Sequence, residues 1–138
     1  IQRKKQVSES FCDAAIFDYH ETMRRLLNDR TLLQTVLKMF IDDTPLQLIQ
    51  LRHHLEKKDF KALILRAHSL KGAASNVGAE QLRQTAASIE SAARAENIST
   101  IFDSIVQFND QFNVFVKEVV QYLETSTHTG LKNEIAGS

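Results

Sequence analysis

The sequence predicts an all-α protein: an up-down antiparallel four-helix bundle with one or two short accessory helices at its N-terminal side. Three observations support this fold class. The 138 residues include four glycines and one proline, which is few for helix breakers. The apolar residues recur at helical rather than alternating spacing, and the connections between helical stretches are short. A chain of this length can bury a hydrophobic core as one domain.

The first half of the chain contains three helical stretches. The first runs from about Phe17 to Leu27 and would form an accessory helix. The second runs from about Thr31 to Asp42 and opens on a Thr-x-x-Gln capping box. The third would begin after Thr44 and extend to about Lys57. Thr44 is a suitable N-cap, and Pro45 would occupy the first helical position, where its missing N–H costs nothing.

The second half contains three longer stretches. Asp59 caps a helix whose apolar positions repeat at four-three spacing until Gly78, which offers a left-handed terminus. A stretch from about Ala79 to Ala95 carries a stripe of small apolar residues and would form an antiparallel hairpin with that helix. The last stretch, about Ser99 to Glu124, keeps the same spacing over seven positions, and this regularity outweighs the β-propensity of its VFVKEVV segment.

The predicted domain covers residues 13–125, between a linker-like lead-in over residues 1–12 and a flexible tail over residues 126–138. The 17 basic and 17 acidic side chains cancel, so the net charge indicates neither nucleic-acid binding nor a polybasic membrane surface. A single cysteine excludes an internal disulfide, and no apolar run reaches the roughly 20 residues of a membrane span. We therefore expect a cytoplasmic monomer whose partners are proteins.

The stretch AHSLKGAASNVGA, residues 67–79, indicates the chemistry. At about 100° per residue, His68 lies far from the apolar stripe of its helix and faces solvent, while Lys71 flanks the stripe and reaches the zone in front of the imidazole. Gly72 lies on the outermost line of the helix, where glycine is about 1 kcal/mol less favourable than alanine. Its missing side chain would let a partner approach.

Phosphoryl transfer to an imidazole nitrogen fits this arrangement. Neutral histidine is a good nucleophile near neutral pH, and a nearby lysine stabilises the charge on the transferring group. A hydrogen-bond acceptor behind the ring would fix the tautomer, and Glu90 on the next helix could lean across the hairpin to serve as that acceptor. A solvated position, or an i,i+4 ion pair with Arg94, accounts for Glu90 equally well at this stage.

The helix that carries His68 resembles the signature of histidine-containing phosphotransfer (HPt) domains. The matching residues are Ala67 to Ala74, Val77-Gly78-Ala79, Leu82, the FIDDTP segment over residues 40–45, Asp59-Phe60 and Ile89-Glu90. The resemblance covers about residues 17–123. It implies a four-helix bundle in which His68 accepts a phosphoryl group from a receiver-domain aspartate and passes it to the aspartate of a response regulator. Because such domains commonly end hybrid sensor histidine kinases and this chain does not begin with Met, we expect the C-terminal HPt domain of a bacterial hybrid kinase.

The resemblance also implies roles for the neighbours of the histidine. Lys71 and Gly72 match family positions beside the phosphohistidine, and Glu90 matches a position whose carboxylate or amide is hydrogen-bonded to the active histidine. The sequence has no glycine-rich phosphate loop, so we expect no ATP site and no cofactor in this chain, with Mg²⁺ supplied by the partner receiver. The candidates for a receiver docking patch are Ile64, Leu65 and Ser75.

Two other functions are compatible with parts of the sequence. One is a helical adaptor that docks receivers or other proteins without relay chemistry. The presence of His68, Lys71 and Gly72 together argues against this function. The other is a metal-dependent hydrolase in a helical bundle, which needs inward-facing Glu-x-x-His motifs that the sequence lacks. We therefore predict no metal site, and we interpret the adjacent His53 and His54 as ordinary surface residues.

Overall fold

The computed structural model describes Arg24 and residues 30–137, with side chains described up to Glu124. Four α-helices follow one another in the described part of the chain. They are α3 (Arg30–Glu56), α4 (Phe60–Asn76), α5 (Glu80–Arg94) and α6 (Ile98–Gly137). Turns of three residues join them. The predicted all-α fold class is confirmed.

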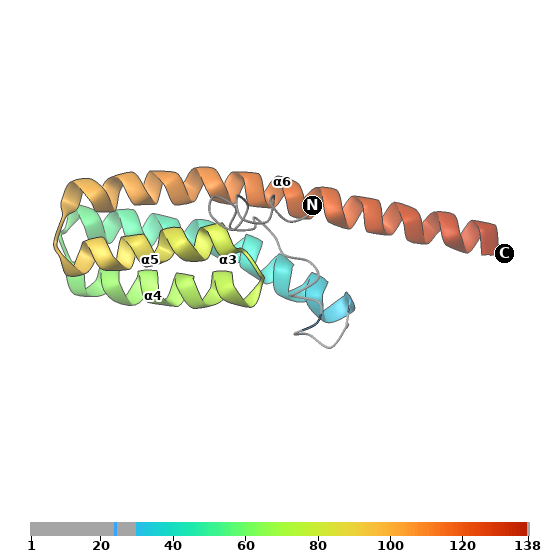
Figure 1. The fold of residues 1–138 in the computed structure, drawn as a ribbon, viewed down its shortest axis with the longest axis horizontal. Coiled ribbons are helices and arrows are strands. Elements are labelled where there is room, and N and C mark those ends of the chain that lie inside the picture. The colour runs from blue at the N-terminus through green and yellow to red at the C-terminus, as the bar shows by residue number, and fades with distance from the viewer. Residues whose placement is uncertain (1–23, 25–29, 138) are drawn as a thin grey trace, which may run out of the picture.

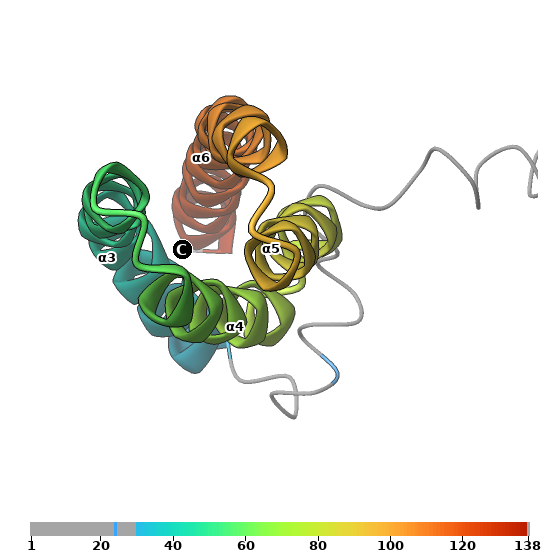
Figure 2. The ribbon, with the colours of Figure 1, turned by 90° about the vertical axis from the view of Figure 1, so that its left-hand side faces the viewer.

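The four helices run alternately up and down around one core. In Figure 1 the α3–α4 and α5–α6 turns lie at one end of the bundle, and the α4–α5 turn lies at the other. In the end-on view of Figure 2 the helices occupy four corners in chain order, so α4 lies diagonally opposite α6. Each helix packs on its two neighbours in this order, and α3 closes the bundle against α6. The short turns account for this topology, because they leave room only for antiparallel neighbours.

The core is built from the apolar stripe of each helix. Between α3 and α6 the stripe is aromatic: the ring of Phe40 packs edge-on against Phe112 and Phe115, with centroids 6.0 and 5.4 Å away. Between α4 and α5 the buried positions are largely small. They include Ala67, Ala74, Ala86 and Ala93, all fully buried. These small residues let the two backbones approach closely, so polar side chains on the flanks of α4 and α5 can reach one another.

The prediction of two separate helices over residues 31–57 is wrong. Helix α3 continues from Arg30 to Glu56 with Pro45 inside it. Thr44 is a buried residue of this helix rather than an N-cap, and its Oγ1 donates to the carbonyl oxygen of Phe40 at 2.7 Å. The proline removes one helical hydrogen bond, but Phe40, Thr44 and Leu48 are all buried on one stripe across it. Tertiary packing thus overrides the local start signal.

Each of the three turns contains a residue in the left-handed region. These residues are Lys58 (φ 54°), Gly78 (φ 73°) and Glu96 (φ 55°). In each turn the next N–H donates to a carbonyl five residues earlier at 2.9 Å, the pattern of a Schellman terminus. The left-handed terminus predicted at Gly78 is confirmed, whereas the other two turns use residues that carry a Cβ.

The C-terminal helix is longer than predicted. The sequence analysis ended it near Glu124 and expected a flexible tail, whereas the backbone of α6 continues to Gly137. No proline follows Glu124, and a helix that has already formed extends at little cost. The domain limits at residues 13 and 125 stay predictions. The lead-in over residues 1–12 and, apart from Arg24, the accessory helix over Phe17–Leu27 lie outside the described residues.

None of the described helices combines the length and the hydropathy that a transmembrane helix needs.

Candidate functional site

His68 lies in the middle of α4 on the side that faces solvent. Its side chain is 68% exposed, whereas Ala67 and Leu70 next to it are buried. The helical period explains this difference, because the buried positions of α4 form one stripe and His68 lies outside it. The imidazole is therefore accessible to a second protein.

The carboxylate of Glu90 organises the site. This residue belongs to α5, and its side chain is 10% exposed. Its Oε2 lies 3.3 Å from Nδ1 of His68, and its Oε1 lies 2.9 Å from Nζ of Lys71. The close approach of α4 and α5 makes both contacts possible, so one carboxylate bridges the hairpin to the histidine and to the lysine.

Arg94 adds a third contact to the same carboxylate. Its Nη2 donates to Oε2 of Glu90 at 3.0 Å, one turn further along α5. The sequence left open whether Glu90 approaches His68 or pairs with Arg94, and the structure shows both contacts at once. The sequence analysis did not assign Arg94 to the site, although its i,i+4 spacing from Glu90 was the available signal.

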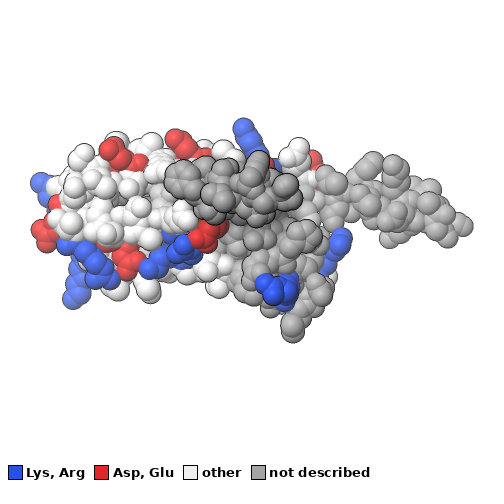
Figure 3. All heavy atoms as spheres, viewed as in Figure 1, with Lys and Arg blue, Asp and Glu red and all other residues white. Residues whose placement is uncertain are grey.

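These contacts lower the pKa of the Glu90 carboxyl below its ordinary value. The hydrogen bond from Lys71 is the largest cause; burial opposes it, and the hydrogen bond from Arg94 and the charges of Lys71 and His68 add to the lowering. Glu90 is therefore ionised at neutral pH and accepts hydrogen bonds without donating any. Figure 3 shows that positive and negative side chains lie close together over this face of the molecule.

An ionised carboxylate beside Nδ1 determines which nitrogen of His68 carries the proton. Because Glu90 can only accept, its contact with Nδ1 favours the tautomer that has its N–H at Nδ1. The lone pair then belongs to Nε2, on the side of the ring away from Glu90. This leaves a nucleophilic nitrogen on an exposed side chain, as phosphoryl transfer requires.

Lys71 is held close to the imidazole by its own contact with Glu90. Its side chain is 31% exposed, which agrees with the predicted position at the flank of the core stripe. The ammonium pairs with the carboxylate behind the ring, whereas the sequence analysis placed it in the zone in front of the ring. It would have to leave Glu90 to reach a group bound at Nε2.

Gly72 leaves an open space on the outer line of α4. A Cβ built at this position would meet no heavy atom within 4 Å, so packing inside the described chain does not require glycine. Glycine in a helix interior is about 1 kcal/mol less favourable than alanine. Glycine at this position therefore leaves a surface free of side-chain atoms one turn from His68, at the expense of helix stability.

The three docking candidates have different environments. Leu65 is 65% exposed, one turn before His68, and Ser75 is exposed in the last turn of α4. Ile64 was expected among the exposed side chains, but it is half-buried and packs against the core. It adjoins the buried stripe and lies one turn before the fully buried Ala67. A docking role for any of the three stays a prediction.

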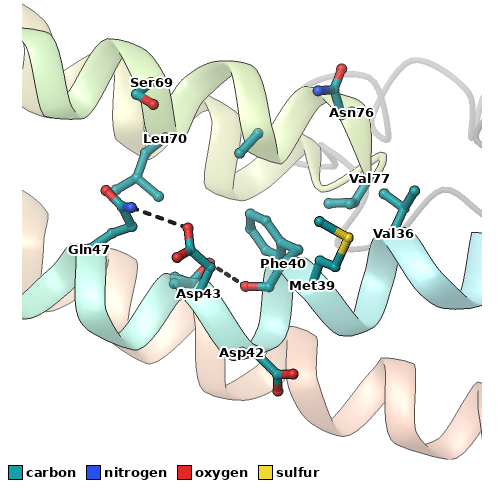
Figure 4. Close-up of a pocket in the computed structure, with 12 residues that line it drawn as sticks. Val36, Met39, Phe40, Asp42, Asp43, Gln47, Ser69, Leu70, Asn76 and Val77 are labelled. Atoms are coloured by element: carbon teal, nitrogen blue, oxygen red, sulfur yellow. Dashed lines mark hydrogen bonds between the residues drawn. The ribbon is translucent and has the colours of Figure 1, made fainter.

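A groove of about 450 Å³ lies between α3 and α4, beside the histidine. Figure 4 shows its apolar walls, which include Phe40 and Leu70. Ser69, the residue after His68, lines the groove, and so does Asp43, whose carboxylate accepts a hydrogen bond from Nε2 of Gln47 at 3.1 Å. This groove was not predicted from the sequence, because the expected helix break at Thr44 and Pro45 falls at this point of α3.

The described side chains form no cluster of three or more His, Cys, Asp or Glu residues that could hold a metal ion. The rings of His53 and His54 lie 6.2 Å apart, centroid to centroid.

Comparisons with known proteins identify a family. The family model described as the Hpt domain matches residues 35–113, more than half of the chain. The matched region contains most of α3, all of α4 and α5, and the first part of α6. A search of curated proteins found no significant match.

Solved structures show the same fold. The chain is 25% identical to histidine-containing phosphotransfer protein B (HptB) from Pseudomonas aeruginosa PAO1, with 82% of this chain and 98% of that chain covered and a TM-score of 0.74. It is 18% identical to the histidine-containing phosphotransfer protein MtHPt2 from Medicago truncatula, with coverages of 94% and 90% and a TM-score of 0.76.

A third solved structure is the HPT domain of a sensor hybrid histidine kinase from Shewanella. The chain is 20% identical to it, with 82% of this chain and 97% of that domain covered and a TM-score of 0.68. At the identities of the Medicago and Shewanella structures the likeness concerns the fold. Together with the match of the family model, these findings show that the chain belongs to the Hpt domain family, which carries out histidine phosphotransfer in two-component phosphorelays.

Proposed function

We propose that His68 is the phosphoacceptor of this Hpt domain. Its Nε2 takes a phosphoryl group from the aspartate of one receiver domain and passes it to the aspartate of a response regulator. The observation that supports this most directly is an exposed imidazole whose Nδ1 lies 3.3 Å from a carboxylate that is 10% exposed. That contact directs the Nδ1 proton toward Glu90 and the lone pair of Nε2 toward a partner.

In the accepting step the lone pair of Nε2 attacks phosphorus, and the P–O bond to the partner's aspartate breaks. The aspartate leaves as a carboxylate, and the phosphorylated imidazole keeps its proton at Nδ1 and gains positive charge. Glu90, ionised and beside Nδ1, stabilises that charge. The donating step is the reverse, with a carboxylate oxygen as the nucleophile. The protein mainly aligns the two groups and balances charge.

Lys71 and Gly72 complete the proposed site. Lys71 contacts the same carboxylate that contacts His68, and in the proposed mechanism its ammonium moves from Glu90 to the oxygens of the transferring group and neutralises their charge. The open space at Gly72 admits the partner loop that carries the aspartate. Leu65 and Ser75, exposed on the same helix, are the proposed contacts at the edge of that interface.

We further propose that this domain has no nucleotide site and no cofactor of its own, and that Mg²⁺ belongs to the partner receiver. Its partners would be the receiver domain of a sensor kinase and that of a response regulator, met as a cytoplasmic monomer without nucleic acid or direct membrane contact. An origin at the C-terminal end of a bacterial hybrid sensor kinase agrees with the likeness to the HPT domain of the Shewanella hybrid kinase.

The test is radiolabelled phosphotransfer from a phosphorylated receiver domain to the wild-type chain, to His68→Gln and to His53→Gln. The His53 variant is the matched control, because it removes an exposed imidazole from the neighbouring helix. We expect an acid-labile, alkali-stable label on the wild type and the control, and none on His68→Gln. Absence of transfer to folded wild-type protein across a panel of receivers would refute the proposal and favour a docking adaptor.

A further inference from the structure

We propose that the basic end of the bundle, formed by Arg52, Lys57, Lys58 and Lys61, is the electrostatic docking element for the acidic face of the receiver domain. These residues lie where α3 passes through its turn into α4. The inference rests on the proposed function of His68. It adds the surface that attracts the partner and orients it on the histidine.

The basic end brings together four cations that have no local ion-pair partners among the described side chains. All four side chains are exposed, and none forms an ion pair with another residue whose side chain is described. Four cations elsewhere are paired, namely Lys38 with Asp42, Lys71 and Arg94 with Glu90, and Arg83 with Glu80, whereas Lys117 on α6 is exposed and unpaired among the described residues. In Figure 3 blue side chains, with red ones among them, lie at the end of the molecule where Figure 1 places the α3–α4 turn.

The carboxylates of the same segment do not balance its positive charges. Residues 52–61 contain four Lys or Arg and two acidic residues, an excess of two positive charges. One of the two, Asp59, is the N-cap of α4, and its Oδ1 accepts the N–H of Ala62 at 3.1 Å. By this count the segment carries a net positive charge.

The basic end is close enough to His68 to be part of the same interface. Lys61 lies seven residues before His68, so both lie on one face of α4, about 10 Å apart along the helix axis. Leu65 lies between them. An interface of standard size buries roughly 800 Å² on each partner, which is a patch roughly 30 Å across. A receiver centred on His68 would therefore cover Lys61 and reach the α3–α4 turn.

The chemistry of the partner supplies the opposite charge. A receiver that exchanges phosphoryl groups with His68 presents its reactive aspartate together with the carboxylates that hold Mg²⁺. Lys61, about 10 Å from the histidine along the helix axis, is too far to contact the reacting atoms, and the other three cations are farther still. Lys61 does lie near one Debye length, which is about 8 Å at physiological ionic strength. The basic end therefore increases the rate of productive encounter rather than the rate of the chemical step.

The groove beside His68 carries charge of the other sign, which gives the partner one orientation. Asp42 and Asp43 are exposed there on α3, and Asp43 lies about 20 Å along the helix from the α3–α4 turn. Asp42 is paired with Lys38, whereas Asp43 accepts a hydrogen bond from the neutral amide of Gln47. An acidic receiver face is attracted to the turn and repelled by Asp43.

The test compares two single charge reversals, Lys61→Glu at the basic end and Lys117→Glu on α6. Lys117 is a matched control, because it is also exposed and unpaired among the described residues, on the helix diagonal to α4. Rapid-quench transfer from a phosphorylated receiver at low salt should show a second-order rate constant about tenfold lower for Lys61→Glu. The first-order rate in the saturated complex should not change. Added salt should reduce the difference, and Lys117→Glu should match the wild type.

A docking-independent donor separates this inference from the proposed function. Phosphoramidate is small and should label His68 equally in the wild type and in both lysine variants. If neither phosphoramidate nor any receiver labels His68, the proposed function fails and the inference fails with it. If His68 is labelled but Lys61→Glu keeps the wild-type rate and salt dependence, the docking inference alone is overturned. An equal loss in Lys117→Glu would overturn it as well, because the effect would not be local.

A triple variant, Lys57→Gln with Lys58→Gln and Lys61→Gln, tests the surface as a unit. We expect a transfer rate that is low at all salt concentrations, with unchanged circular dichroism. Unchanged receiver transfer, combined with lost binding to phosphatidylserine vesicles that the wild type binds, would overturn the proposal and identify an anionic membrane as the partner.

Discussion

Replacement of Gly72 by alanine should make the protein more stable and a poorer phosphotransfer partner. The added Cβ meets no heavy atom within 4 Å, so the substitution introduces no clash in the described chain. Alanine is favoured over glycine in a helix interior by about 0.8–1.0 kcal/mol. We expect the free energy of unfolding to rise by about 1 kcal/mol, which corresponds to a melting temperature about 3 °C higher for a chain of this size.

The same substitution at Gly78 is the control, because glycine is favoured there by the backbone conformation. Gly78 adopts a φ of 73° at the end of α4, where an L-residue with a Cβ costs about 1–2 kcal/mol. Urea denaturation of Gly72→Ala and Gly78→Ala should therefore give changes of opposite sign. A loss of stability in Gly72→Ala would show that the backbone or a neighbour does require glycine there, and the argument from open space would be wrong.

The predicted effect of residue 72 on phosphotransfer is tested with a second variant that has a larger side chain. Gly72→Leu should slow transfer from a receiver by about tenfold, which equals about 1.4 kcal/mol, with a smaller effect for Gly72→Ala. Labelling by phosphoramidate should not change, because that donor needs no room for a protein loop. Undiminished receiver transfer to Gly72→Leu would refute the idea that the missing side chain admits the partner.

Three further predictions concern stability and are measured by denaturation. Glu90→Ala should lose about 1–3 kcal/mol at neutral pH, because Lys71 loses its charged partner. The folded-state pKa of Glu90 is lowered, so its contribution to the free energy of unfolding is present above the ordinary carboxyl pKa and is lost as the pH falls through the folded-state pKa. A difference in the free energy of unfolding between variant and wild type that persists in strong acid would contradict this. Pro45→Ala should gain about 1–3 kcal/mol by restoring a donor inside α3, and no gain would indicate that the helix breaks there. Lys58→Gly should gain about 1 kcal/mol by relieving its left-handed conformation, whereas Lys57→Gly should not.

The helical pattern of the sequence was sufficient to predict the fold class and the buried face of most helices. On α6 the predicted stripe is buried at Ile101, Ile105, Phe108, Phe112, Phe115 and Val119. The physical reason is local, because the period of the α-helix decides which residues share a face. The same reasoning correctly placed His68 and Gly72 on the outside of α4, since exposure is the complement of the buried stripe.

Local signals failed where packing opposed them. Thr44 and Pro45 form a convincing helix start when read alone, yet α3 passes through them. Burial of Phe40 and Leu48 on one continuous stripe outweighs the hydrogen bond lost at the proline, and this gain depends on the position of α6, which no local pattern contains. The groove beside Ser69 lies between α3 and α4. It could not be predicted from local signals either, because it depends on α3 continuing through Pro45.

The sequence by itself therefore determined the helical fold class, the buried face of most helices and the exposed histidine with its lysine and glycine. The tertiary structure decided what holds the imidazole. Glu90 meets His68, Lys71 and Arg94 through the carboxylate of one side chain, and two of these contacts cross from α5 to α4. They depend on how closely the two helices approach and on their register along the common axis. Those quantities arise from the packing of small residues between two helices, whereas the period of a single helix fixes only directions around its own axis.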